Sequence, residues 1–337
     1  MRGKFSFNTY SKPIILIAFI VVLWLLAGSN FMNVSNIGSV LNSVSVIGIM
    51  VCGTIFVFLI GGIDLSIGAL LGLTGVVCVE VINGLGATPG SVVLGILAAV
   101  AVGALAGLFH GFIVTTFDIP AFLVTFATQT AFTGLSMVIT GNKIVSCTQP
   151  ALFTGIAATK ILMLPLPIYF MLLMALASWF VLRRTVFGRQ VYAVGGNPTA
   201  AEISGINVKG RSIACYVLSG VAAAIGGVVL ASMNQQGMAS QGADYVNSVI
   251  TAGVIGGVSL LGGEGTVPGA MYGTVLMGLL TNGLNLMGVD STQAGLVTGV
   301  VTVAAVAIDA AQHLDQSKRK AGGLFPGLQK RKDVTAS

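Results

Sequence analysis

A glycine-rich interruption, with one acid and one hydroxyl, separates two long apolar runs in the first quarter of the chain. It contains Gly61, Gly62, Asp64, Ser66 and Gly68. Either Asp64 or Ser66 can cap the helix that follows, because both offer an acceptor to unpaired backbone N–H groups. Alternatively, Asp64 takes part in gating, since ionisable groups at membrane depth are usually functional and the glycines permit a helix break. The residues leave both interpretations open.

A mid-chain loop, about 183–211, carries the pattern of a short capped helix. Asn197 is a good N-cap, Pro198 suits the first helical position, and Gly205 is placed to end the helix. A helix this short is marginal in water and needs a surface to pack against. That surface is either the membrane and the chain's own bundle, or a cytoplasmic partner that docks on the helix.

Polar side chains inside apolar runs form a third group. Such residues usually make hydrogen bonds between helices. A hydrophilic solute that crosses the bundle also needs polar groups along its path, so these residues are the candidate pathway. They are Asn42, Ser45, Thr125, Thr128, Gln129, Asn282 and Asn285.

Enzymatic chemistry is not indicated. The sequence has no phosphate-binding loop of the G-x-x-x-x-G-K-[ST] type, so any ATP is bound by another chain. His110 and His313 stand far apart without a carboxylate cluster, and the four cysteines are single, which disfavours a metal site and a redox pair. We therefore expect no catalytic residue, no metal and no cofactor.

The elements that must position these residues are predicted to be membrane helices. Of 337 residues, 55% are apolar and only 8% are charged, and the mean hydropathy is +0.96. A soluble domain has about 25% charged residues, whereas about 20 apolar residues span a bilayer as a helix. We predict an all-α polytopic membrane protein, a single transmembrane domain over residues 1–337, with about ten helices. The apolar runs are 13–28, 37–60, 66–83, 91–117, 119–140, 166–182, 212–233, 247–261, 267–288 and 294–311.

The charges predict the topology. Lys and Arg number 16 against 10 Asp and Glu, and most of them lie before the first run, in the loop 183–211, and in a basic tail at about 312–337. This placement follows the positive-inside rule and puts both termini, the loop and the tail in the cytoplasm, which explains the basic charge without nucleic acid. Lys143 and Lys160 then fall together in one external loop.

The chain also shows signs of an internal repeat. Residues 61–69 can be aligned with 262–270, but residues 60–62 can equally be aligned with 255–257. Repeats are common in transporter folds, yet two competing registers leave the duplication open.

Five segments resemble the membrane permeases of bacterial ABC importers for monosaccharides, the ribose, galactose and xylose type. The resemblance implies two permease copies, or one copy and a related permease, with a cytoplasmic ATP-binding subunit and an extracytoplasmic sugar-binding protein. It also implies that the capped helix belongs to the loop that engages the ATPase. The segments are 61–68 (GGIDLSIG), 119–128 (IPAFLVTFAT), 187–205 (FGRQVYAVGGNPTAAEISG), 242–263 (GADYVNSVITAGVIGGVSLLGG) and 282–288 (NGLNLMG). The docking-loop residues are Phe187, Gly188, Arg189, Gly195, Gly196, Asn197, Pro198, Ala201, Glu202 and Gly205.

We therefore expect a permease subunit of the bacterial inner membrane that imports a sugar or sugar-like solute by alternating access. Two departures from the usual pattern, at residues 125–128 and 291–294, lie where solute identity could be set, so the solute itself is not assigned. The alternative is an ion-coupled secondary transporter of a small polar solute, which would need a carboxylate or histidine relay at mid-membrane. A membrane scaffold without transport is a third hypothesis.

Overall fold

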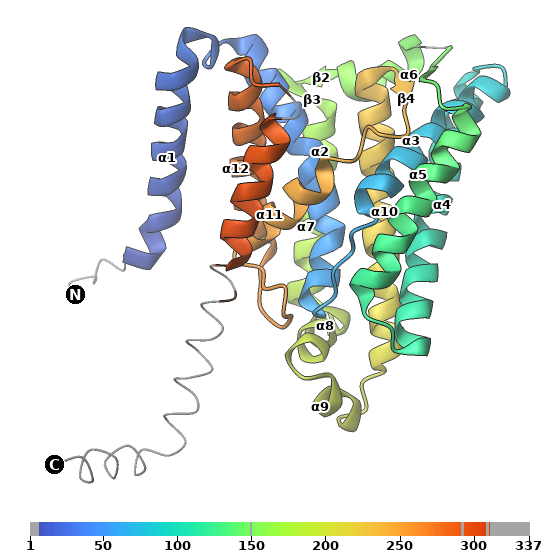
Figure 1. The fold of residues 1–337 in the computed structure, drawn as a ribbon, viewed down its shortest axis with the longest axis vertical. Coiled ribbons are helices and arrows are strands. Elements are labelled where there is room, and N and C mark those ends of the chain that lie inside the picture. Colours follow the sequence, from blue (N-terminus) through green and yellow to red (C-terminus); the bar gives the residue numbers. More distant parts are fainter. Residues whose placement is uncertain (1–6, 149, 291–292, 308–309, 311–337) are drawn as a thin grey trace.

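The computed structural model describes residues 7–148, 150–290, 293–307 and 310. These residues form a bundle of long helices with short connections (Figure 1), which confirms the predicted all-α polytopic class. Six helices are long and apolar enough to cross a membrane. They are α2 (Val34–Leu59), α3 (Ile67–Gly84), α4 (Pro89–Phe117), α5 (Ala121–Thr140), α7 (Leu166–Arg184) and α10 (Val208–Asn234).

The remaining helices of the described residues are not among these six. Every apolar run of the sequence coincides with a helix in the described residues, but ten crossings stay a prediction, and α11, with 11 residues, is too short to span a bilayer alone. A single transmembrane domain over the whole chain also stays a prediction. These helices are α1 (Phe7–Ala27), η1 (Gly28–Asn30), α6 (Pro150–Ala158), α8 (Val186–Gly196), α9 (Pro198–Ile203), α11 (Tyr245–Ile255), α12 (Val267–Leu286) and Gln293–Ala307.

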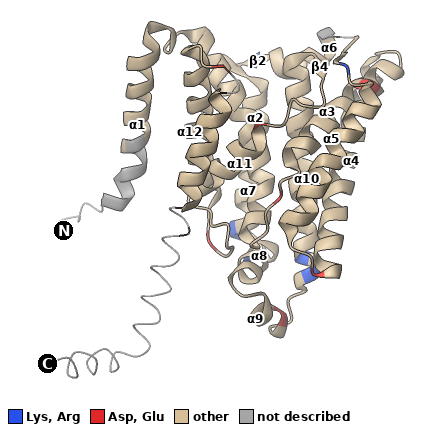
Figure 2. Ribbon diagram, viewed as in Figure 1, with Lys and Arg blue, Asp and Glu red and all other residues tan. Residues whose placement is uncertain are grey.

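Four strands of two residues each tie the connections together at one end of the bundle. Strand β1 (Val145–Ser146) pairs antiparallel with β4 (Gln236–Gly237), and β2 (Lys160–Ile161) pairs antiparallel with β3 (Leu164–Pro165). Helices α8 and α9 project from the opposite end (Figure 1). Lys and Arg gather at both ends, and few charged residues lie between them (Figure 2). The tail at 312–337 lies outside the described residues, and which end faces the cytoplasm stays a prediction.

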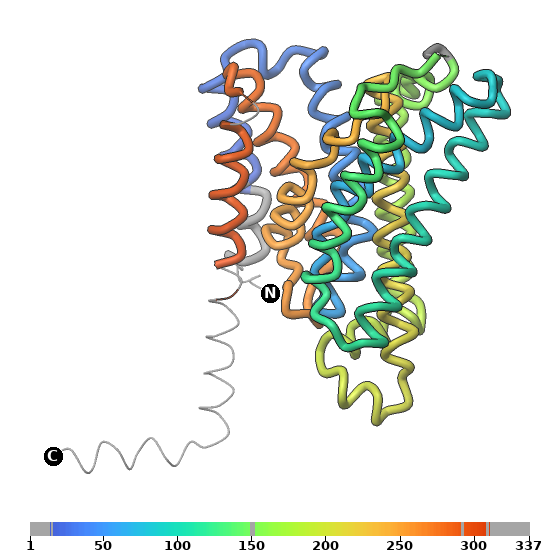
Figure 3. Tube along the Cα trace, turned by 45° about the vertical axis from the view of Figure 1, so that its right-hand side comes forward, coloured from blue at the N-terminus to red at the C-terminus, as the bar shows by residue number. Residues whose placement is uncertain are grey.

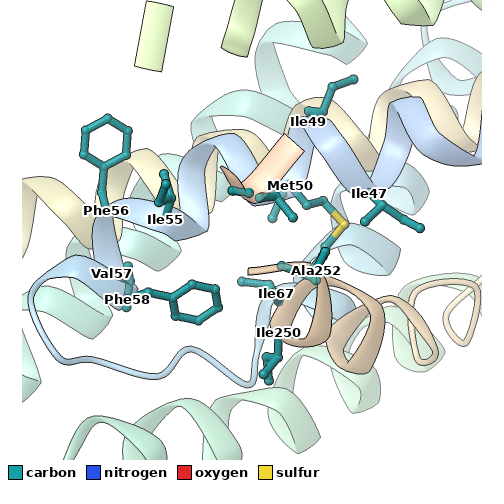
Figure 4. Packing of buried hydrophobic residues seen from close by; sticks show 14 of the residues in the cluster. Ile47, Ile49, Met50, Ile55, Phe56, Val57, Phe58, Ile67, Ile250 and Ala252 are labelled. Carbon is teal, nitrogen blue, oxygen red and sulfur yellow. The ribbon is translucent and has the colours of Figure 1, made fainter. Parts of the chain in front are cut away.

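Helices α2, α3 and α10 form the centre of the bundle. Helix α10 packs against α2, α3 and α4, and α2 is buried without interruption from Val44 to Leu59. The side chains of Phe58, Ile67 and Ile250 come together where α2, α3 and α11 meet (Figure 4). In a turned view, α4 and α5 lie on one side of this centre and residues 293–307 on the other (Figure 3).

Small residues allow the helices to approach closely, as lipid-embedded helices require. Gly103 of α4 and Gly220 of α10 face each other so closely that a Cβ on either would collide with the carbonyl oxygen of the other. A Cβ on Gly107 would collide with the carbonyl oxygen of Tyr216. Glycines therefore bring the backbones of α4 and α10 into direct contact.

Candidate coupling site and solute cavity

Two helices of the bundle, α2 and α11, end in the same way. After α2, Gly61 takes a left-handed conformation with φ of +77°, and the N–H of Gly62 bonds a carbonyl oxygen five residues back at 2.9 Å. After α11, Gly257 has φ of +85°, and the N–H of Val258 makes the same bond at 2.9 Å. Both ends are Schellman-type caps, in which glycine accepts the left-handed position without strain.

The two breaks differ in length, which explains the competing repeat registers. The break between α2 and α3 spans residues 60–66, and the break between α11 and α12 spans residues 256–266, so the second has eleven residues against seven. A register that matches the two helix ends therefore fails to match the two helix starts. Duplication itself stays a prediction.

The breaks lie against each other. The N–H of Gly263 donates a hydrogen bond of 2.9 Å to the carbonyl of Leu59, the last residue of α2. A Cβ on Gly262 would lie 2.8 Å from the backbone nitrogen of Gly61. A displacement of either break therefore moves the other.

Helix α8 ends on this junction. A Cβ on Gly195 would collide with the carbonyl oxygen of Leu59 and lie 2.6 Å from the backbone nitrogen of Gly263, whereas a Cβ on the neighbouring Gly196 would meet nothing within 4 Å. The hydroxyl of Tyr192 donates a hydrogen bond of 2.8 Å to the carbonyl of Gly265. Burial raises the pKa of the Tyr192 hydroxyl, so this donor stays protonated. Helix α8 thus contacts both breaks.

The start of α8 is held by aromatic contacts. The ring of Phe187 lies 6.2 Å from that of Phe56 on α2, and the guanidinium of Arg211 lies 5.6 Å from the Phe187 ring. Gly188 packs against the last turn of α7, where a Cβ would collide with backbone carbonyl oxygens. Arg189 is exposed. The sequence reasoning treated this stretch as a loop and missed the helix.

The predicted capped helix is present as α9. The side chain of Asn197 accepts a hydrogen bond of 2.9 Å from the N–H of Ala200, Pro198 is the first residue, and Gly205 follows the helix with φ of +81°. Ala201 is buried, whereas Ile203 is 83% exposed.

Asp64 lies inside the bundle with 1% of its surface exposed. One carboxylate oxygen accepts hydrogen bonds from the N–H of Ser66 at 3.0 Å and its hydroxyl at 2.7 Å. The other accepts a hydrogen bond of 3.1 Å from the hydroxyl of Ser219 on α10. Ser66 holds the N-cap position of α3 without a side-chain capping bond, so Asp64 instead fixes the turn just before the helix and ties that turn to α10. Gly68 lies inside α3, where its Cα packs against the backbone of Gly242.

The predicted pathway residues of α5 hold this break from the other side. The hydroxyl of Thr125 accepts a hydrogen bond of 3.1 Å from the N–H of Leu65. The hydroxyl of Thr128 lies 2.7 Å from the Nε2 of His110, which is fully buried on α4. Sequence reasoning considered His110 only as a metal ligand and missed this contact, because no local pattern relates the two helices.

The other predicted pathway residues lie in different parts of the bundle and make different contacts. Asn282 of α12 and Asn36 of α2 exchange two hydrogen bonds of 2.8 and 3.0 Å while buried, so Asn282 joins two helices. Ser45 donates to a carbonyl of its own helix. The Oδ1 of Asn42 is buried with no hydrogen-bond partner among the described residues, and Gln129 is half-buried on α5.

Asn285 instead lines a cavity of about 240 Å³. The cavity lies where α2, the start of α11, the end of α12 and residues 293–307 meet. Of the predicted pathway residues it contains Asn285 alone. The predicted pathway residues therefore do not form one cluster: Thr125 contacts a break, Asn282 joins two helices, and Asn285 lines a cavity.

Comparison with known proteins identifies the family of this chain. Residues 36–306 match the family described as the permease component of the branched-chain amino acid transport system. The chain is 36% identical to the ribose import permease protein of Escherichia coli (strain K12) over 299 residues, which cover 87% of this chain and 92% of the relative. This chain belongs to that permease family. No solved structure matches it.

Two further relatives support the membership of this permease. The ribose import permease protein of Bacillus subtilis (strain 168) is 36% identical over 298 residues, 88% of this chain and 91% of the relative. The xylose transport system permease protein of Escherichia coli (strain K12) is 30% identical over 341 residues, 83% and 86%. The permease is therefore a multi-pass transport subunit of the bacterial inner membrane and not an enzyme, and permeases of ABC importers work with ATP-binding and solute-binding partners.

Proposed function

We propose that this permease forms the translocation pathway of an ATP-driven importer for a sugar or sugar-like solute and works by alternating access. The solute class is supported by the relatives, which are named for ribose and xylose. The family description names branched-chain amino acids instead. A test of the solute must therefore compare sugars with branched-chain amino acids.

The observation that carries the mechanism is the position of α8 against both helix breaks. Helix α9 offers the exposed Ile203 and Glu202 to a partner, and α8 directly precedes α9, with only Asn197 between them. Closure of an ATPase pair would push α9, and Gly195 would transmit the displacement to Leu59 and Gly263. Both α2–α3 and α11–α12 would then shift together, as a change between two access states requires.

The hydrogen bonds of the first break support a gating role for it. Asp64 joins α3 to Ser219 on α10, and Thr125 joins the same break to α5. These bonds hold three helices to one short extended segment. A movement of the segment therefore repositions α3 against both α5 and α10.

The assembly that we propose has two permease chains, either two copies of this one or one copy and a related permease. A cytoplasmic ATP-binding subunit docks on α9, and an extracytoplasmic sugar-binding protein approaches the opposite end. Exposed basic side chains there, Lys143 and Lys160, are available to that protein. A cysteine in place of Glu202 should cross-link to the ATP-binding subunit, whereas a cysteine in place of Lys160 should not.

An ion-coupled transporter remains the competing function for one reason. The structure places a histidine and a carboxylate in the same buried region, because Asp64 and His110 lie close enough for their charges to interact. Uptake into membrane vesicles with and without the ATP-binding subunit separates the two functions. ATP-driven import requires the subunit, and uptake that persists without it would overturn the proposal.

A further inference from the structure

The cavity beside Asn285 has the size of a small solute. Its volume of about 240 Å³ corresponds to on the order of eight water molecules at roughly 30 Å³ each. A cavity of that volume has room for one monosaccharide. The cavity lies in the half of the bundle away from α9, where the N-terminal half of α2 and the C-terminal turn of α12 are found.

The walls of the cavity present mostly hydrogen-bond acceptors. The hydroxyls of Ser248, Thr281 and Thr298 each donate to a carbonyl of their own helix at 2.9 to 3.2 Å, so their oxygens remain as acceptors. Asp244 adds a carboxylate, and the side-chain amides of Asn247 and Asn285 supply both donors and acceptors. The complementary ligand carries several hydroxyls, because each hydroxyl can donate and accept. The polar lining residues are Ser43, Asp244, Asn247, Ser248, Thr281, Asn285 and Thr298.

The charge of the cavity selects among hydroxylated solutes. Asp244 is the one charged residue among the described residues that line it. A phosphorylated sugar, a sugar acid or the carboxylate of an amino acid would meet the carboxylate of Asp244 there and no cation among these residues. The ring of Tyr245 and the side chain of Ile47 complete the wall and offer apolar surface to the C–H groups of a sugar ring.

We propose that this cavity binds a neutral monosaccharide while the sugar crosses the permease. Asn247 and Asn285 are the residues that determine which arrangement of sugar hydroxyls the cavity accepts. The inference rests on the proposed function. It adds that solute recognition is shared between the binding protein and a site inside the permease itself.

Cysteine labelling tests the site directly. All four native cysteines are buried, so a hydrophilic maleimide should react chiefly with an introduced thiol. Asn285→Cys and, as a second variant, Asn247→Cys should be labelled in membranes. Ser39→Cys is the matched control, because Ser39 is exposed on α2 one turn from Ser43 and does not line the cavity.

The probes are ribose, xylose, ribose 5-phosphate and leucine, each at a concentration that saturates wild-type uptake of the transported sugar. The neutral sugar that the complete wild-type importer transports should slow labelling at residue 285 or 247, and ribose 5-phosphate and leucine should not. Labelling at residue 39 should be the same with every probe. Equal labelling with and without the transported sugar, in both cavity variants, would overturn the site.

Uptake kinetics separate this proposal from the proposed function. Asn285→Ala should raise the KM for the transported sugar about five- to tenfold, the loss of one net hydrogen bond, and change the ratio of ribose to xylose uptake. Ser39→Ala should leave both unchanged. If the wild-type importer transports no monosaccharide, with allose and fructose tried beside ribose and xylose, the proposed function fails. If it transports one and Asn285→Ala and Asn247→Ala keep its KM and ratio, only the cavity proposal fails.

Discussion

Replacing Gly195 with alanine tests the contact that links the docking helix to the bundle. The added Cβ would collide with the carbonyl oxygen of Leu59 and lie 2.6 Å from the nitrogen of Gly263. Both neighbours are backbone atoms, so α8 must move away from the junction or the junction must deform. Overpacking of this kind costs about 1–3 kcal/mol, which corresponds to a coupling change of about 5- to 150-fold.

The assay measures solute imported per ATP hydrolysed by the reconstituted importer. In Gly195→Ala we expect ATP hydrolysis to continue, because the ATP site lies in another chain, while import per ATP falls about fivefold or more. Gly196→Ala is the steric control, since its Cβ meets nothing within 4 Å, and it should retain import per ATP. Wild-type import per ATP in Gly195→Ala, or an equal fall in both variants, would refute the coupling through α8.

Four other substitutions, with one control, test separate parts of the structure. Ala201→Pro breaks α9 and Glu202→Lys reverses its exposed charge; both should uncouple ATP hydrolysis from uptake at normal membrane levels, and normal uptake in both would remove the case for a docking helix. Asp64→Ala leaves three buried donors without their acceptor and should lower the free energy of unfolding by about 1–3 kcal/mol, visible as a lower Tm in detergent; an unchanged Tm would contradict it. Gly107→Ala should also lower the Tm, by overpacking α4 against α10, and Gly134→Ala, whose Cβ meets nothing within 4 Å, should not; equal Tm values would argue against close glycine packing.

The helices were predictable because their signals are local. An apolar run of membrane length requires only its own residues, and α9 was predicted from a cap, a proline and a terminal glycine within nine positions, 197–205. Helix α8 was missed because three glycines fall inside it. Its apolar residues Phe187, Val191 and Val194 stand at i, i+4 and i+7, and this spacing was the signal that could have revealed an amphipathic helix.

The site was less predictable because its contacts are remote in sequence. Asp64 bonds Ser219, which lies 155 positions away, and no periodicity states which helices become neighbours. Residues three positions apart also differ in role, since Asn282 bonds another helix while Asn285 lines the cavity. Composition identifies polar residues in apolar runs, but only the packing of the bundle decides which ones face a cavity.

The most direct test of the account is sugar accumulation in proteoliposomes that contain this permease, its ATP-binding subunit and its solute-binding protein. With ATP available to the ATP-binding subunit, the account predicts that a neutral monosaccharide accumulates against its gradient and that an uncoupler has no effect. A non-hydrolysable ATP analogue should abolish the accumulation. Accumulation that persists with the analogue, or that the uncoupler collapses while ATP is maintained, would contradict an ATP-driven permease.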